Sequence, residues 1–208
     1  MYNLPQSTDI NKPLYKTAIF EKFNLKAAER ERFDADISRM ALVAYVAPSR
    51  VPALKEGQEV KDFYVLQVIL KQQNYDTKNI MLLQKLIPQH IIFALEYNSS
   101  LGEVGRGLTQ FCIFHTRLQQ SEWMLTDDVA LMLNGISIDD VWNNLVASIG
   151  NLDVSSEESI EQQIINREER EKLLQQIELL EKRCRVEKQT RKKYELHQKL
   201  LRLKEGLS

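Results

Sequence analysis

The sequence is poor in cysteine and histidine, the residues that cross-link small domains or bind metals. Its two cysteines, Cys112 and Cys184, lie far apart and form neither a disulfide framework nor a metal-site spacing. The three histidines, His90, His115 and His197, make no metal-binding pattern either. We therefore expect two reduced thiols, no bound metal and no cofactor.

Long hydrophobic runs are also lacking. No apolar run reaches the length of about 18 residues that a membrane-spanning helix requires. The N-terminal stretch MYNLPQSTDINKPLYK has no apolar core behind a basic start, so it does not look like a signal peptide. With 43% apolar and 27% charged residues, the chain is expected to be a globular, cytoplasmic protein that binds no membrane.

Sequence motifs of common enzymes are absent as well. There is no Gly-x-Ser-x-Gly, His-Glu-x-x-His or dinucleotide-binding pattern. The stretch GEVGRG at residues 102–107 has three glycines but not the Gly-Lys-Ser/Thr ending of a nucleotide-binding loop, so it is predicted to be a hairpin turn. These absences favour a binding protein over an enzyme.

The distribution of proline, tryptophan and glycine separates the chain into two parts. All five prolines and both tryptophans lie in residues 1–150, whereas residues 151–208 contain no proline and a single glycine, Gly206. The junction, IGNLDVSSEES, is polar and turn-prone. We therefore predict a globular domain in residues 1–150 and a helical tail in residues 151–208.

The first part alternates helical and strand-like patterns. Helices are expected at 26–40, 75–88 and 137–150, where apolar residues recur at helical spacing, with Asp76 and Gly150 as caps. Strands are expected at 41–48, 62–71, 90–97 and 108–115, with a short edge strand at 122–125. The predicted fold class is α+β, with a largely antiparallel sheet of about four or five strands packed by helices.

Apolar residues in the tail follow the four-three spacing of a coiled coil. One series is Leu173, Ile177, Leu180 and Cys184, and the other is Leu196, Leu200, Leu203 and Leu207. The two series are out of phase, so a single helix would leave the middle without an apolar stripe. We therefore predict an antiparallel coiled-coil hairpin with its turn near residues 187–192. One long helix that forms a homodimer is the alternative.

Positive charge is concentrated at this predicted turn, although the whole chain has a formal net charge of -1. In KRCRVEKQTRKK, residues 182–193, only Glu187 is acidic. The basic residues are Lys182, Arg183, Arg185, Lys188, Arg191, Lys192 and Lys193. Clustered cations neutralise phosphates, and the nearby Tyr194 and His197 are suited to stacking on bases. The turn is therefore the candidate site for nucleic acid or a protein partner, unless its cations pair with glutamates of the neighbouring arm.

A nuclease is the enzymatic alternative for the first part. Restriction-type nucleases place an acidic residue before a strand that carries Glu-x-Lys or Asp-x-Lys, because divalent cations prefer carboxylate oxygens and lysine stabilises phosphate charge. Here Asp62 and Lys71 bracket a strand, and Glu96 on the next strand would supply a second carboxylate. Ile69 stands where the motif needs an acid. The catalytic set of this alternative is Asp62, Lys71 and Glu96.

Five stretches of the sequence carry a family resemblance, namely LVAYVAPS, VKDFYVLQVILKQQNYDTKNIMLLQKLIPQHIIFALEY, FHTRLQQSEW, LNGISIDDVWNNLVASIG and the tail REEREKLLQQIELLEKRCRVEKQTRKKYELHQKLLRLKEGL. Through these stretches, and over nearly its whole length, the chain resembles the bacterial domain-of-unknown-function family 4391. The resemblance brings no catalytic motif to these residues. The family strand often carries an acidic residue where this chain has Gln67, a departure that weakens the nuclease alternative.

The genomic setting of the family implies a role. Its members are small bacterial proteins, often encoded beside Swi/Snf-type helicases and DNA methyltransferases, which suggests restriction or phage defence. We therefore expect a non-enzymatic accessory protein that binds a helicase- or methyltransferase-type partner, and DNA, through the basic turn. A divergent nuclease and a homodimeric structural protein are the alternatives.

Overall fold

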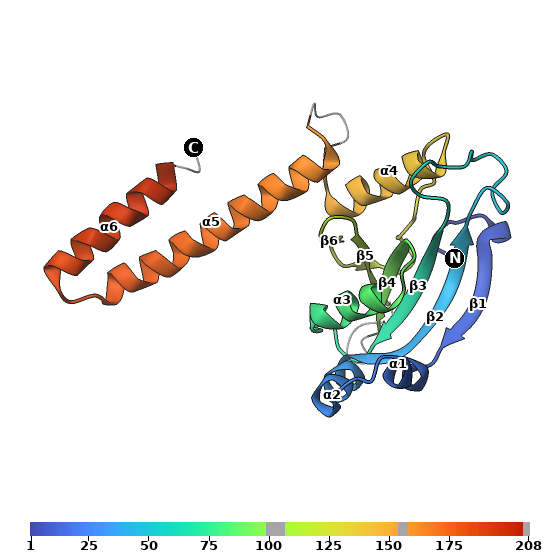
Figure 1. The fold of residues 1–208 in the computed structure, drawn as a ribbon, viewed down its shortest axis with the longest axis horizontal. Helices are drawn as coiled ribbons and strands as arrows, with labels where there is room; N and C mark the ends of the chain where they lie inside the picture. The colour runs from blue at the N-terminus through green and yellow to red at the C-terminus, as the bar shows by residue number, and fades with distance from the viewer. Residues whose placement is uncertain (99–106, 154–157, 206–208) are drawn as a thin grey trace. The chain divides into compact units, whose positions relative to one another are not determined.

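The structure is a computed structural model that describes residues 1–98, 107–153 and 158–205 (Figure 1). The chain divides into two compact units, Met1–Val154 and Ser155–Ser208. The first unit contains a short helix η1 (Gln6–Thr8), then β1 (Asp9–Leu14), α1 (Lys16–Lys22), α2 (Ala27–Asp36), β2 (Ile37–Val46), β3 (Phe63–Leu70), α3 (Thr77–Leu86), β4 (Ile91–Tyr97), β5 (Leu108–Phe114), β6 (Leu118–Gln120), β7 (Met124–Leu125) and α4 (Ile138–Gly150). No helix in the described ranges is long and apolar enough to cross a membrane.

The first unit is built on one mixed sheet, which confirms the predicted α+β class. Its strands are ordered β1-β2-β3-β4-β5-β6, and β7 pairs with β5. All neighbouring strands are antiparallel except β3 and β4, which are parallel and are connected through α3. The predicted hairpin of β4 and β5 is confirmed, but the sheet has seven strands instead of about four or five. The hairpin turn predicted at 102–107 lies outside the described residues except for Gly107.

The two additional strands have weak sequence signals. β1 has the sequence DINKPL, in which Pro13 lacks a backbone donor and no residue is fully buried. Proline is tolerated there because β1 is an edge strand. β6 is only three residues long, too short for an alternating pattern to be recognised.

The helix predicted at 26–40 is wrong beyond Asp36. α2 ends at Asp36, and Ile37 begins β2, where Ile37 pairs with Leu70 and Met40 with Val68. The buried Asp36 carboxylate fixes this junction, because it accepts hydrogen bonds from the Asp76 backbone and the Asn79 side chain, both at 2.8 Å. Ile37 and Met40 have helical spacing relative to Phe33, but tertiary contacts place them in the sheet.

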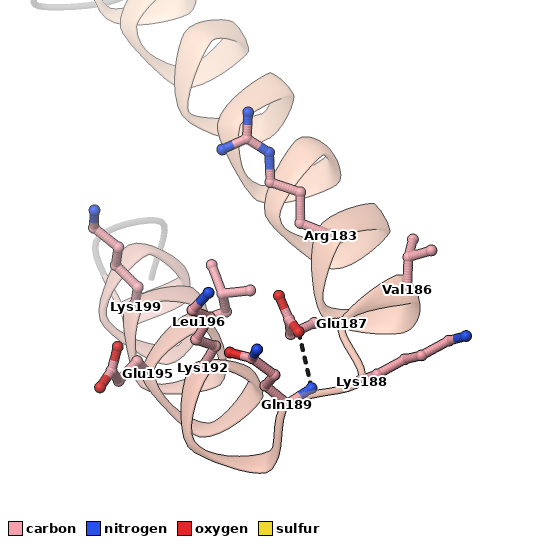
Figure 2. A pocket seen from close by; sticks show the side chains of 9 residues that line it. All are labelled: Arg183, Val186, Glu187, Lys188, Gln189, Lys192, Glu195, Leu196 and Lys199. Atoms are coloured by element: carbon pink, nitrogen blue, oxygen red, sulfur yellow. Dashed lines mark hydrogen bonds between the residues drawn. The ribbon is translucent and has the colours of Figure 1, made fainter.

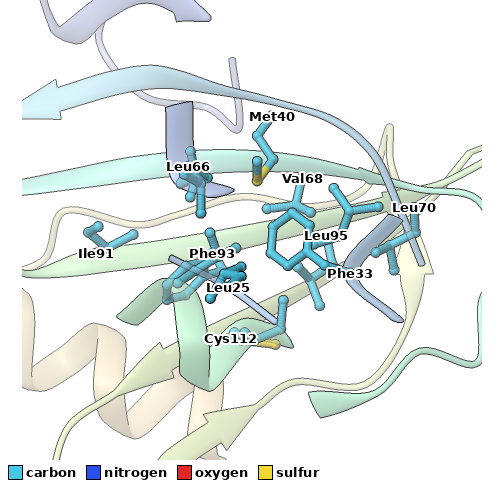
Figure 3. Close-up of a cluster of buried hydrophobic side chains, with 14 residues drawn as sticks. Leu25, Phe33, Met40, Leu66, Val68, Leu70, Ile91, Phe93, Leu95 and Cys112 are labelled. Atoms are coloured by element: carbon cyan, nitrogen blue, oxygen red, sulfur yellow. The ribbon is translucent and has the colours of Figure 1, made fainter. Parts of the chain in front are cut away.

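Helices α1, α2 and α3 pack against the sheet and form the main core with it. Figure 3 shows the buried side chains of this core. The predicted N-cap of α3 is confirmed, because the Asp76 carboxylate accepts a hydrogen bond from Lys78 N at 2.9 Å. The most buried members of this cluster are Phe33, Ile37, Leu66, Val68, Ile80, Leu83, Phe93, Leu95 and Cys112. Since each lies at 0% exposure, this core supplies a large part of the hydrophobic stabilisation.

Helix α4 covers the opposite face. Side chains alternate along a strand, so Phe63 points away from the Leu66 side, and its ring lies 5.6 Å from that of Trp142. The predicted C-cap at Gly150 is wrong, because Asn151 adopts the left-handed conformation (φ 50°, ψ 53°) and Gly150 is the last helical residue. Gly150 instead permits close packing: an added Cβ would lie 3.0 Å from Gln119 of β6.

The loop before β3 is held by a carboxylate of α4. Asp139 accepts backbone hydrogen bonds from Gln58 at 2.5 Å and from Val60 at 2.7 Å. These bonds, led by the one from Val60, lower the pKa of Asp139 below its usual value. A Cβ at Gly57 would collide with the Val60 carbonyl oxygen and the Asp139 carboxylate, so the loop requires glycine there.

The second unit is a pair of helices, α5 (Ile160–Val186) and α6 (Thr190–Glu205), connected by Glu187–Gln189 (Figure 1). This confirms the predicted helical pair and its turn. Ile177 and Leu200 are each 7% exposed, and Lys204 Nζ of α6 lies 2.7 Å from Glu181 Oε1 of α5. The other predicted seam residues are half-buried, namely Leu173, Leu180, Cys184, Leu196 and Leu203, while Leu207 lies outside the described residues.

Candidate functional site

The turn between α5 and α6 forms without glycine or proline. Glu187 takes an extended conformation (φ -69°, ψ 123°) at the end of α5, and its backbone N–H donates to Arg183 O. Its carboxylate accepts a hydrogen bond from Gln189 N at 2.8 Å. The Glu187 side chain therefore stabilises the turn that carries the basic residues.

A concavity of about 830 Å³ lies inside this turn (Figure 2). Its lining residues are Arg183, Val186, Glu187, Lys188, Gln189, Lys192, Glu195, Leu196 and Lys199. Four of these are cations and two are carboxylates, which leaves a formal surplus of two positive charges. The concavity is open and its lining combines cations with two aliphatic side chains, so it suits an anionic ligand better than a neutral one.

The structure distributes the seven predicted residues over two surfaces of the turn. Arg183, Lys188 and Lys192 line the concavity. Lys182, Arg185, Arg191 and Lys193 do not line it, although they are exposed like the first three. The cations therefore surround the turn instead of forming a single stripe.

Lys199 is a lining residue that the sequence analysis did not identify. It lies outside the basic run at 182–193, and the analysis followed that run. The signal for it is helical periodicity, because Lys192, Leu196 and Lys199 recur at i, i+4 and i+7 and so share one face of α6. Reading the tail by helical face would have predicted Lys199.

Ion pairs neutralise few of these cations. Lys182 Nζ lies 2.6 Å from Glu178 Oε1, and Arg191 Nε lies 3.3 Å from Glu195 Oε1, each within its own helix. Such exposed pairs are worth little energetically. Within the ranges that the structure describes, the remaining five cations, Arg183, Arg185, Lys188, Lys192 and Lys193, form no ion pair. In the described part of the tail, none of the seven forms an ion pair with a glutamate of the neighbouring arm, which was the alternative to a binding role.

The residues of the nuclease alternative are kept apart by β3. Asp62 directly precedes this strand and Lys71 directly follows it. At a rise of about 3.3 Å per residue, their Cα atoms are separated by about 30 Å. The Tyr45 hydroxyl donates to Asp62 Oδ2 at 3.1 Å, whereas the Lys71 ammonium donates to the carbonyl oxygen of Asp34. One metal ion or one phosphate does not reach both side chains.

Glu96, the third residue of that alternative, is occupied by a structural contact. It is 9% exposed, and its carboxylate accepts a hydrogen bond from the Tyr2 hydroxyl at 2.6 Å. Burial, together with the nearby Glu96 charge, raises the pKa of Tyr2 and keeps its hydroxyl protonated as the donor. Among the residues described, no group of three His, Cys, Asp or Glu side chains is placed to hold a metal ion.

The fold and the turn together define an α+β protein that carries a C-terminal helical pair with a basic end. The chain belongs to the family described as domain of unknown function DUF4391, whose model matches residues 2–207. No curated protein and no solved structure matches the chain. The matched residues span both units.

Proposed function

We propose that this protein is a non-enzymatic accessory protein of a bacterial DNA-processing or phage-defence system. In this proposal, the basic turn docks on phosphates of DNA that a helicase- or methyltransferase-type partner holds. The partner supplies the catalysis and this chain supplies the contact.

The observation that carries the proposal is the state of the cations at the turn. All seven predicted basic residues are exposed, and five of them form no ion pair within the described part of the chain. Unpaired cations of a protein replace the counterions that are condensed on DNA phosphates, and the release of those counterions drives association. A surface whose cations were already paired with carboxylates would gain much less from phosphates.

The non-enzymatic part of the proposal is supported by the geometry of β3. Asp62 and Lys71 lie at opposite ends of that strand, and Glu96 accepts a hydrogen bond from Tyr2. DNA cleavage in magnesium or manganese that is lost in Asp62→Ala would contradict this part and restore the nuclease alternative.

Two double charge reversals of the same design test the role of the turn. Lys192→Glu with Lys199→Glu reverses two cations of the concavity, seven residues apart on α6. Lys78→Glu with Lys85→Glu makes the same change at the same spacing on α3 of the first unit, where both lysines are exposed. Both variants change the net charge equally, so any difference between them reports the location of the charge.

DNA binding by full-length protein is measured by fluorescence anisotropy across a salt series. We expect the α6 variant to bind more weakly and to lower the slope of log K against log salt by about two, because two phosphate contacts are lost. The α3 variant should bind like the wild type. Equal losses in the two variants, or no salt-dependent binding by the wild type, would refute the proposed function.

A further inference from the structure

Tyr194 of α6 lies exposed beside the basic turn and has no structural role in the described residues. It is 65% exposed. It takes part in no ring contact and no side-chain hydrogen bond within the described part of the chain. A tyrosine that packs in a core or interface buries roughly 150–250 Å². Most of that area is available here for a ligand.

The Tyr194 ring projects from the outer face of α6. At about 100° per residue, Tyr194 is between about 120° and 180° around the helix from the sheltered Leu196, Leu200 and Leu203. It is also not one of the residues that line the concavity (Figure 2). The outer face of α6 is therefore a surface distinct from both the helix–helix contact and the concavity.

Cations flank the Tyr194 ring on both sides of this outer face. Arg191 and Lys193 are adjacent to it in helical position, and Arg202 lies two turns further along; all three are exposed. His197 and Leu201, one and two turns beyond Tyr194, are exposed on the same face. The Arg191 pair with Glu195 is solvent-exposed, so a phosphate can replace it at little cost. A planar ring between cations matches a ligand that has both bases and phosphates.

We infer that the outer face of α6 binds single-stranded nucleic acid. The Tyr194 ring stacks on one base, while Arg191, Lys193 and Arg202 contact the flanking phosphates. This inference rests on the proposed function and specifies the ligand of the same basic helical end. Base stacking on an aromatic side chain requires a base that is free of its neighbours, which a single strand offers and a duplex does not.

The test removes the ring without changing charge. Full-length wild type, Tyr194→Ala and Tyr194→Phe are titrated with labelled thymine and uracil single strands of about 20 nucleotides, longer than the usual site size of a single-strand groove. A duplex of the same length is the comparison ligand. The Phe variant is the matched control because it keeps the stacking ring and removes only the hydroxyl. Circular dichroism confirms that all three proteins have equal helix content, as expected for an exposed position.

We expect Tyr194→Ala to weaken single-strand binding by about 5- to 100-fold, and Tyr194→Phe to bind like the wild type. The salt slope should stay the same, because no charge is altered. Duplex affinity should change less than about twofold, since the duplex offers no free base. Tyr194-dependent binding of either the thymine or the uracil strand supports the inference.

Two outcomes would overturn it and leave the proposed function standing. One is an equal loss on single strand and duplex, and the other is no loss in Tyr194→Ala while charge reversal at Lys192 and Lys199 weakens binding. Displacement of the strand by polyglutamate without any dependence on Tyr194 would indicate an acidic protein ligand and would count against the proposed phosphate contact as well. Absence of salt-dependent binding by the wild type would refute the proposed function and the inference together.

Discussion

At the scale of single residues, local hydrogen-bonding signals were predictable and packing requirements were not. Asp76 was predicted as an N-cap from its position alone, and it accepts the expected hydrogen bond from Lys78 N. Gly150 was assigned as a C-cap by residue type, but Asn151 adopts the left-handed conformation. Gly150 is needed because Gln119 packs against it, and this contact between distant positions cannot be predicted from the local sequence.

The Asp139 clamp makes a prediction about stability and pH. Asp139→Asn should lower the free energy of unfolding by about 1–2 kcal/mol at neutral pH, because charge-assisted bonds to Gln58 and Val60 are weakened. The pKa of Asp139 is lowered in the folded state, so its contribution is present above the unfolded pKa and is lost as pH falls through the folded pKa. Urea unfolding at neutral and acidic pH measures this.

The control for this clamp is Asp127→Asn, at an exposed aspartate. Its effect should be close to zero at both pH values, because a surface substitution rarely exceeds about 0.5 kcal/mol. A difference between wild type and Asp139→Asn that is as large at acidic as at neutral pH would contradict the role given to the Asp139 charge.

The two cysteines should differ sharply in reactivity. Burial raises the pKa of Cys112 to about 11, and the residue is 0% exposed between strands and helices, so little thiolate forms and reagents do not reach it. Cys184 is half-buried on α5. A thiol-specific disulfide reagent should therefore modify one thiol in the native protein and two in denaturant. Cys184→Ser should abolish the native reaction, and rapid modification of two native thiols would contradict this account.

At the scale of helices and strands, periodicity identified the buried strands and most helices but not their edges. β3 and β4 are long, apolar and central, so their sequences have no competing interpretation. The α2–β2 junction was misplaced because Ile37 and Met40 satisfy both a helical spacing and the sheet register. Buried contacts of Asp36 decide between the two, and such contacts between distant residues cannot be read from a local window.

Adjacent leucines of α6 provide a test of the helical pair. Leu200 is 7% exposed, whereas Leu201 is 42% exposed. Leu200→Ala should destabilise the pair by about 2–4 kcal/mol, because it removes buried methyl groups and leaves a cavity. Leu201→Ala should cost less than about 1 kcal/mol, because the exposed Leu201 side chain loses little buried apolar surface when it is truncated. Amide hydrogen exchange at 190–205 measures both, and equal protection in the two variants would contradict the assigned helix faces.

At the scale of the whole molecule, the sequence predicted the fold class but not the strand order. The parallel pairing of β3 with β4 depends on how α3 crosses the sheet, and no local pattern encodes it. The candidate site shows the same limit. The basic run from 182 to 193 was visible in the sequence, but its division between a concavity and an outer face depends on how α6 lies against α5.

The helical pair also bears on assembly. Because Ile177 and Leu200 are already sheltered within the chain, we expect light scattering to give the mass of one chain, 24.3 kDa. A mass of twice that value, which falls to a monomer when residues 155–208 are removed, would instead support the homodimer alternative.

The sequence separation of contacting residues differs between the two units, and this difference bears on the order in which the units fold. The first unit is closed by contacts between very distant positions, such as the Tyr2 hydroxyl with Glu96, which are 94 residues apart. The second unit is closed by near neighbours in sequence, such as Glu181 with Lys204. Local helical contacts form within about microseconds, whereas sheets of high contact order take about milliseconds to seconds. On refolding, the helical pair should therefore form before the strands of the sheet reach their final register, so the second unit becomes ordered before the first.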